Sequence, residues 1–365
     1  MGQRQVLFAL ALAACGDDGA TSADASIDTP PSADASIDAA APVFEPGLPL
    51  LLSADSPNND EDPAILRARD GSIYVAWFSV SAGNDIMISR TVDGVHWSAP
   101  THVSSGVPAD LGPTLYQDSA GIIHAAWFRW PGQQPPGGIV HVAATSPDTI
   151  NWGSEVNVTT SNATDDWLPT LATNPAGDLV VAFARNTCPP PTCYGLAAST
   201  STDHGATWST PAPIVAADST TEHFLPALAN TGSELVVAWD PYDHGAQFPF
   251  AGITTGSHIS LMHSATGATW TNASDITTRQ TNSIGTMPTL FADHANVWHV
   301  AWLAADSTGA RVVERPLDVP SATPVQLPID GYSPRIVATP TPGVFLAAWV
   351  GGADGQRDIY VRVFQ

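Results

Sequence analysis

The sequence predicts an all-β protein, a six-bladed β-propeller of four-stranded antiparallel blades whose ring is closed by an N-terminal strand. A motif made of Pro, an apolar segment, a turn and a strand ending in Ala-Trp or Ala-Phe occurs six times. The second strand of each copy is apolar at almost every position, as expected for a strand buried on both faces. The copies are Pro63–Trp77, Pro113–Trp127, Pro169–Phe183, Pro226–Trp239, Pro288–Trp302 and Pro334–Trp349.

The composition is that of a folded, acidic protein. With 44% hydrophobic residues, including 12 Trp and 11 Phe, the 365-residue chain has far more apolar surface to bury than a disordered acidic chain. Its formal net charge of −23 repels the phosphates of nucleic acid, which is therefore excluded as a partner. We expect a monomer.

The N-terminus, residues 1–14, is predicted to be a signal peptide. Arg4 precedes a short apolar segment, Val6–Ala14, which is too short to cross a membrane as a helix. The segment ends in Leu12-Ala13-Ala14-Cys15, which resembles the lipobox of bacterial lipoproteins. The resemblance implies cleavage before Cys15 and lipidation of that residue, hence a lipoprotein of the bacterial cell envelope, periplasmic or at the surface. An ordinary signal peptide is the alternative.

Residues 15–46 are predicted to be a flexible tether, and residues 47–365 the propeller. The tether is rich in Ala, Ser, Asp and Pro, and its segment Ser22–Asp28 is repeated as Ser32–Asp38. A segment of this composition has almost nothing to bury.

The cysteines favour a disulfide over a metal site. Once Cys15 is set aside, Cys188 and Cys193 remain, separated by a tight loop, and one local disulfide is expected in an exported protein. A zinc site is the rival, but two Cys supply too few ligands. The acidic segment Asn58–Asp62 offers oxygen ligands for Ca²⁺ but lacks the spacing of a calcium loop, so no metal or other cofactor is expected.

A turn with a recurring sequence follows the third strand of several copies, and its fullest form is Ser201–Trp208. Its Asp and Ser oxygens can accept turn N–H groups, its Gly permits a positive φ, and its Trp can fill the seam between blades. We expect these residues to be structural rather than catalytic. They are Asp93, Trp97, Asp148, Trp152, Ser201, Asp203, Gly205, Trp208 and Trp270.

The last copy stops after its third strand, Asp358–Val363, and no fourth strand remains before the C-terminus. Leu48–Ser53 precedes the first copy with the spacing of the other fourth strands. We therefore expect the ring to be closed by this N-terminal strand, which protects otherwise open sheet edges.

From Leu48 to Gln365 the repeats and turns resemble the sialidase superfamily and related Asp-box (BNR-repeat) propellers. The resemblance implies an active site on the face opposite the turns, with a Tyr nucleophile activated by a Glu, an Asp acid and three Arg. Gly331-Tyr332-Ser333 is similar to the sequence around that nucleophile, and Glu222 and Asp85 are suitably placed as its partner and as the acid. Ordinary packing of Tyr332 at a strand start is the alternative, and Asp85-Ile86 recurs as Asp358-Ile359, which suggests a repeat feature.

The arginines that hold a sialic acid carboxylate are where the sequence departs from the family. The family's Phe-Arg-Ile-Pro is Asp60–Pro63 here, and the fourth hairpin, Trp239–Tyr242, also lacks an Arg. Arg holds a carboxylate through two parallel hydrogen bonds, whereas an acid repels it. Arg129, Arg185 and Arg311 lie in other hairpins, where they can rebuild an anion site or pair with neighbouring acids.

The sequence therefore indicates two alternative functions. The first is a binding propeller that recognises a glycan or a protein, because fold alone does not transmit activity and two expected Arg are missing. The alternative is a sialidase-type exo-glycoside hydrolase that uses Tyr332, Glu222 and Asp85. The candidate ligand-binding residues are Arg129, Trp130, Asp166, Trp167, Arg185, Tyr242 and Arg311.

Overall fold

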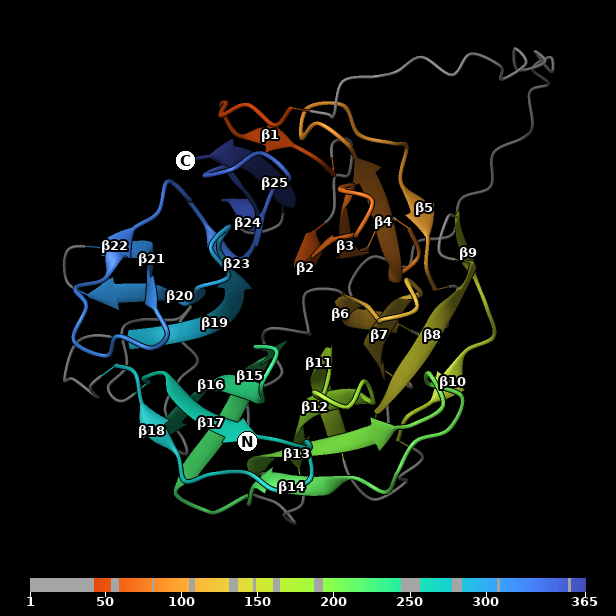
Figure 1. The fold of residues 1–365 in the computed structure, drawn as a ribbon, viewed down its shortest axis with the longest axis vertical. Coiled ribbons are helices and arrows are strands. Elements are labelled where there is room, and N and C mark those ends of the chain that lie inside the picture. The colour runs from red at the N-terminus through yellow and green to blue at the C-terminus, as the bar shows by residue number, and fades with distance from the viewer. Residues whose placement is uncertain are drawn as a thin grey trace.

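The computed structural model confirms the predicted fold. Six antiparallel sheets of mostly short strands surround a central axis, and they follow one another around the ring in chain order (Figure 1). No helix long and apolar enough to cross a bilayer is found in the part of the chain that the structure describes. That part comprises residues 43–53, 59–80, 82–104, 109–130, 137–146, 149–159, 165–186, 193–243, 257–277, 284–306, 309–353 and 356–365. The predicted signal peptide, Cys15 and most of the tether lie outside it.

The first strand of each blade lies nearest the axis, and the later strands follow outward. Blade 1 contains β2 (Asp60–Arg67), β3 (Ile73–Ser79), β4 (Asp85–Thr91) and β5 (Thr101–His102). Blade 2 contains β6 (Ala109–Gln117), β7 (Ile123–Trp130), β8 (Gly138–Ser146) and β10 (Val156–Asn157), with β9 (Thr149–Trp152) also paired to β8. Blade 3 contains β11 (Asp165–Thr173), β12 (Leu179–Asn186), β13 (Tyr194–Ser201) and β14 (Ala212–Val215).

The remaining three blades repeat this order. Blade 4 contains β15 (Thr221–Asn230), β16 (Leu235–Asp243), β17 (Ser260–Ser264) and β18 (Ser274–Asp275). Blade 5 contains β19 (Ile284–Ala292), β20 (Trp298–Asp306), β21 (Gly309–Pro316) and β22 (Val325–Gln326). Blade 6 contains β23 (Tyr332–Ala338), β24 (Phe345–Ala353), β25 (Gln356–Phe364) and β1 (Leu50–Leu51).

The ring is closed by the N-terminal strand, as predicted, but this strand, β1 (Leu50–Leu51), is shorter than the expected segment Leu48–Ser53. β1 pairs antiparallel with β25, with Leu50 opposite Val361, and Leu52 N donates to Ile359 O at 2.8 Å (Figure 1). Blade 6 is therefore built from both ends of the chain, and β25 is not left as an open edge, because β1 forms the outer strand of this blade.

The Ala-Trp ending of the second strands builds the contacts between blades. Trp77, Trp127, Trp239 and Trp349 are all almost completely buried. Trp77 of blade 1 packs in one cluster with Leu346 of blade 6, and Trp349 of blade 6 packs with Leu303 of blade 5. The all-apolar second strands are thus explained, because each is covered by a blade on both faces.

The Pro that recurs in all six copies of the repeat marks a β-bulge in every blade. The residue before each Pro has a positive φ between 51° and 57°, and the pairing of the first two strands shifts register at that point. Such a bulge leaves one residue unpaired, and Pro, which has no N–H to donate, is suited to it. We call the six residues before the prolines the collar. They are Asp62, Gly112, Leu168, Leu225, Met287 and Ser333.

The recurring turns close the opposite end of the third strands. In the first, Gly94 N donates to Thr91 Oγ1 at 2.8 Å and Trp97 Nε1 donates to Gly94 O at 3.3 Å. The same two bonds recur in the turns from Ser201 to Trp208 and from Ser264 to Trp270. Because neighbouring strands are antiparallel, these turns lie at the end of the ring away from the bulges. The remaining turn residue, Asp148, lies outside the described residues.

Removing one of these turn bonds is expected to have a measurable effect on stability. Trp270 Nε1 donates to Gly267 O at 3.1 Å, whereas the buried Nε1 of Trp152 has no hydrogen-bond partner in the part of the chain that the structure describes. Trp270→Phe should therefore lower the free energy of unfolding by about 1 kcal/mol through the lost bond. Trp152→Phe is the matched control and should lower the free energy of unfolding by less, or raise it. Denaturant unfolding of both variants measures the difference. Equal losses would contradict the bond's contribution.

Candidate functional site

The end of the ring that carries the bulges, which we call the bulge face, holds the residues predicted to act on a ligand. The first strands begin there, and the second strands end there, because the two are antiparallel. Side chains from the starts of β2, β6, β11, β15, β19 and β23 therefore converge around the axis at this face.

The three predicted catalytic residues lie in different blades and contact different neighbours. Glu222, in β15, is fully buried, and its Oε2 accepts a hydrogen bond from Tyr194 N at 2.9 Å. Asp85, in β4, has its Oδ2 3.2 Å from His102 Nδ1.

Tyr332, the third of these residues, packs against the two core clusters that join blade 6 to blade 1 and to blade 5, with the Arg357 guanidinium 5.9 Å from its ring centre. The tripeptide around it has a packing explanation. A Cβ at Gly331 would come within 2.2 Å of Trp349 Cδ1, and Ser333 is the collar residue, at φ 53°. The structure therefore accounts for Gly331 and Ser333 without a catalytic role for Tyr332.

Two of the predicted binding arginines are held by buried carboxylates at equivalent positions of neighbouring blades. Arg129 Nε and Nη2 donate to the two oxygens of Asp110 at 2.7 and 2.9 Å. Arg185 Nε and Nη2 donate to the two oxygens of Asp166 at 2.7 Å each. Arg129 also pairs with Glu155, and its acidic neighbours raise the pKa of its guanidinium further. Bidentate pairs of this kind use the donors that an anionic ligand would need.

The other arginines of this face are paired as well. Arg311 Nη2 lies 2.9 Å from Asp306 Oδ2. Glu61, which stands where the sialidase family has an Arg, accepts a hydrogen bond from Arg357 Nη1 of the adjacent blade at 2.9 Å. Within the described part of this face, the arginines are neutralised by acids rather than arranged as an open clamp for a carboxylate.

Aromatic side chains from blades 2 and 3 form a group on the bulge face. Trp130 and Trp167 meet edge to face with their ring centres 5.5 Å apart, and Trp167 stacks on the buried Phe128 at 4.6 Å. Both Trp side chains are half-buried. Tyr242 extends a second group, with its ring 6.1 Å from that of Phe224. The structure therefore brings the predicted Trp130 and Trp167 together.

Two buried carboxyl groups near the bulges were missed by the sequence analysis. Burial raises the pKa of Asp60 to about 6, although Ser79 and Ser53 donate hydrogen bonds to it. Burial also raises the pKa of Asp240 well above its usual range, and Asp240 accepts a hydrogen bond from the Thr286 hydroxyl. One oxygen of each carboxyl, Oδ1 in both, has no hydrogen-bond partner among the described residues. In the sequence, Asp60 belongs to an acidic segment that offers ligands for Ca²⁺ and to the segment that replaces the family's Phe-Arg-Ile-Pro, and nothing in the sequence marks Asp240 as buried.

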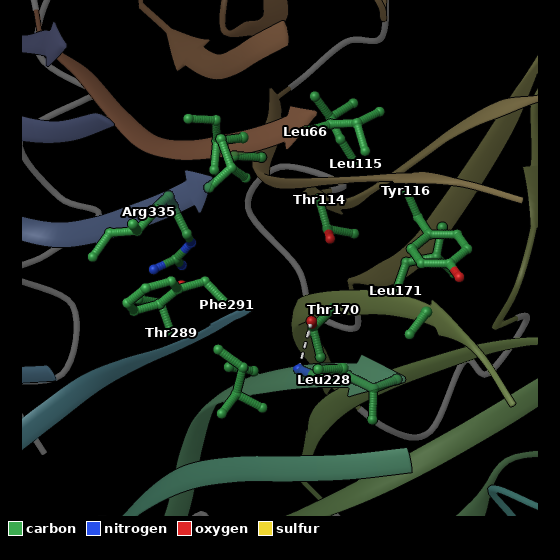
Figure 2. Close-up of a pocket in the computed structure, with 18 of the residues that line it drawn as sticks. Leu66, Thr114, Leu115, Tyr116, Thr170, Leu171, Leu228, Thr289, Phe291 and Arg335 are labelled. Atoms are coloured by element: carbon green, nitrogen blue, oxygen red, sulfur yellow. Dashed lines mark hydrogen bonds between the residues drawn. The ribbon is translucent and has the colours of Figure 1, made fainter. Parts of the chain in front are cut away.

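A cavity of about 460 Å³ lies on the axis, lined by the first strands of all six blades. Figure 2 shows the guanidinium of Arg335 directed into it and the Thr114, Thr170 and Thr289 side chains on its wall. Arg335 directly follows its Pro, a position occupied by Ala or Thr in the other five copies. That departure from the repeat is the sequence signal that could have identified it.

The described residues include candidate metal ligands and one of the two cysteines predicted to form a disulfide. Among the described residues, no group of three or more His, Cys, Asp or Glu is arranged to hold a metal ion. Cys193 is buried, but Cys188 lies outside the described residues, so their disulfide stays a prediction.

Comparison with known proteins shows similarity in fold only. No protein-family profile matches the chain, and no curated protein matches its sequence. A protein of unknown function from Dyadobacter fermentans superposes with a TM-score of 0.70, 15% identity, and coverage of 87% of this chain and 98% of that one. The α-L-arabinanase of Penicillium chrysogenum, solved with arabinobiose, superposes with a TM-score of 0.67 and 14% identity, over 88% of this chain and 98% of that one.

A sialidase is also among the similar structures. The Hadza microbial sialidase superposes with a TM-score of 0.56 and 16% identity, over 84% of this chain and 66% of that one. The chain thus has the fold of a group of propellers that includes glycoside hydrolases, and identities this low establish the fold and not the activity.

Proposed function

We propose that this chain is a cell-envelope lipoprotein that binds a neutral glycan on its bulge face. The observation that carries the proposal is the pair of half-buried rings, Trp130 and Trp167, held edge to face on that face. Half-exposed aromatic rings with fixed geometry offer an apolar surface to the C–H face of a sugar ring. The lipid on Cys15 and the tether would hold the propeller at a membrane, and a protein ligand is the other occupant to test.

Charge favours a neutral rather than an acidic glycan. Arg129, Arg185, Arg311 and Arg357 are all engaged by acids, and the chain carries a formal net charge of −23. An anionic sugar approaching this face would meet excess negative charge and, among the residues that the structure describes there, no open guanidinium to hold it. Carboxylate oxygens such as those of Asp165, which accepts from Tyr194 Oη at 3.2 Å, are suited instead to sugar hydroxyls.

Trp167→Ala should weaken glycan binding by about tenfold or more, because it removes a central aromatic contact. Calorimetric titration of the full chain with arabino-oligosaccharides and with other neutral oligosaccharides that bind on a glycan array measures the change. Trp270→Phe, at the opposite end of the ring, is the control and should leave the affinity unchanged. The proposal fails if no neutral glycan binds, or if Trp167→Ala and Trp270→Phe bind it alike.

Glycoside hydrolysis is the second candidate function, favoured by the buried carboxyl groups of Asp60 and Asp240. Carboxyl groups whose pKa is raised by burial are suited to act as general acids and are found at active sites. Hydrolysis of fluorogenic arabinosides and sialosides by the full chain tests this. If the wild type hydrolyses a substrate and Tyr332→Phe or Asp240→Asn does not, the protein is a glycoside hydrolase and the binding proposal is rejected.

A further inference from the structure

The axial cavity is separate from the proposed glycan face. Its lining begins at the six prolines or just after them and continues toward the end of the ring that carries the turns, as far as Asp293 and Asn296. No collar residue belongs to the lining. The collar is crowded, since a Cβ at Gly112 would lie 3.3 Å from Leu168 Cδ2. The collar thus stands between the cavity and the bulge face.

The charge of the lining is opposite in sign to that of the protein. Among the described lining residues, the ionisable side chains other than Tyr are Arg67, Arg335 and Asp293, two cations and one acid, in a chain of formal net charge −23. Asp293 is already engaged, because its Oδ1 accepts from the N–H groups of Ala295 and Val297 at 2.8 Å each. An excess of positive charge inside an acidic protein attracts an anion.

The Arg335 guanidinium lacks an ion-pair partner among the described residues. Its hydrogen bond there is donated by Nη1 to Pro334 O at 2.9 Å, and no described carboxylate lies within 4.0 Å of it. Asp62, in the collar, is the acid whose charge acts on it from further away, and burial raises the pKa of Asp62. A guanidinium stays ionised at all ordinary pH values, so its charge here is only weakly compensated.

Hydroxyl groups stand at the level of Arg335. Thr114, Thr170 and Thr289 each follow a Pro, the position that Arg335 has in blade 6. Thr170 Oγ1 accepts a hydrogen bond from Leu228 N at 3.1 Å (Figure 2), so its own O–H remains available to donate. Hydroxyl donors beside a planar guanidinium fork match the oxygens of a carboxylate.

We propose that the axial cavity binds a small organic carboxylate, held by Arg335 and by the threonine hydroxyls at its level. The volume of about 460 Å³ exceeds the needs of a single inorganic ion and falls in the range of small-molecule sites. Apolar side chains, Leu66 and Phe291 among them, line the rest of the cavity and suit the carbon part of such a ligand (Figure 2). The site does not depend on the proposed glycan function.

The test is calorimetric titration of the full chain with succinate, and with 1,4-butanediol as a neutral control of the same carbon number. Saturable binding of succinate but not of butanediol is expected. Arg335→Met, which keeps an unbranched side chain and removes the charge and the guanidinium donors, should weaken succinate binding about tenfold to a hundredfold. Arg335→Lys should recover part of the affinity, and Arg311→Gln, on the bulge face, should retain all of it.

The proposal is overturned if succinate does not saturate the protein, if butanediol binds equally well, or if Arg335→Met binds succinate as the wild type does. Should Arg335→Met fail to fold, as judged by circular dichroism, Thr289→Val provides the second variant. It should weaken succinate binding severalfold, and unchanged affinity in this variant would count against the site. Glycan binding measured on the same variants separates this proposal from the glycan proposal, because the collar lies between the two sites.

Discussion

Asp166→Ala is expected to lower the free energy of unfolding by about 3–5 kcal/mol, because it leaves a largely buried guanidinium without its carboxylate. Both oxygens of Asp166 are bound by Arg185 at 2.7 Å, and the Arg185 side chain is only 15% exposed. Denaturant unfolding of the full chain at pH 7 measures the loss.

The matched controls for this prediction are a double variant and a more exposed pair. Asp166→Ala combined with Arg185→Met removes both charges and should recover most of the lost stability. Asp306→Ala breaks the Arg311 pair, in which both side chains are more than a quarter exposed, and should change the free energy of unfolding by no more than about 1 kcal/mol. If Asp166→Ala loses no more than Asp306→Ala, the buried pair is not a major source of stability.

Stability should also depend on the protonation of Asp60. Its pKa is raised to about 6 in the folded protein, against 3.8 for an ordinary Asp, so the folded state binds more protons than the unfolded state between these values. The contribution of Asp60 is therefore fully present below pH 4 and is lost as pH rises through 6, by about 3 kcal/mol in total. Asp60→Asn, which cannot ionise, should remove this dependence.

The measurement is the difference in unfolding free energy between wild type and Asp60→Asn at pH 4, 5, 6 and 7. The difference is needed because other groups titrate in this range in the opposite direction. Burial lowers the pKa of His141 to about 3, which makes the protein lose stability as pH falls below 6.5. A difference that does not change between pH 4 and 7 would show that Asp60 ionises as easily when folded as when unfolded.

The repeat predicted the architecture because every blade needs the same strands and the same contacts with its neighbours, so the residues that form them recur in each copy. The Ala-Trp endings became the buried interblade contacts, and the missing fourth strand correctly predicted the pairing of β1 with β25. The collar was not foreseen. A residue before Pro normally adopts an extended conformation, so nothing in the sequence indicated that Asp62 or Leu168 would have a positive φ.

The candidate site was less predictable than the fold, because it depends on which side chains meet across blades. Trp130 and Trp167 come from different blades, and their contact follows from the interblade packing rather than from any local pattern. Arg129 and Arg185 were considered both as ligand-binding and as paired with acids. Only the strand register, which places Asp110 opposite Arg129 and Asp166 opposite Arg185, shows how they pair.

The way the ring closes has a consequence for biosynthesis. β1 is among the first strands to be synthesised, yet its partner β25 is among the last, and bonds such as Ile359 N to Ser53 Oγ join residues 306 positions apart. The other five sheets contain only strands that follow one another along the chain, so each can form as its segment leaves the ribosome. Blade 6 must wait for the whole chain, because contacts this distant form late. A chain that ends before β25 would therefore keep five blades and an exposed strand at each side of the gap.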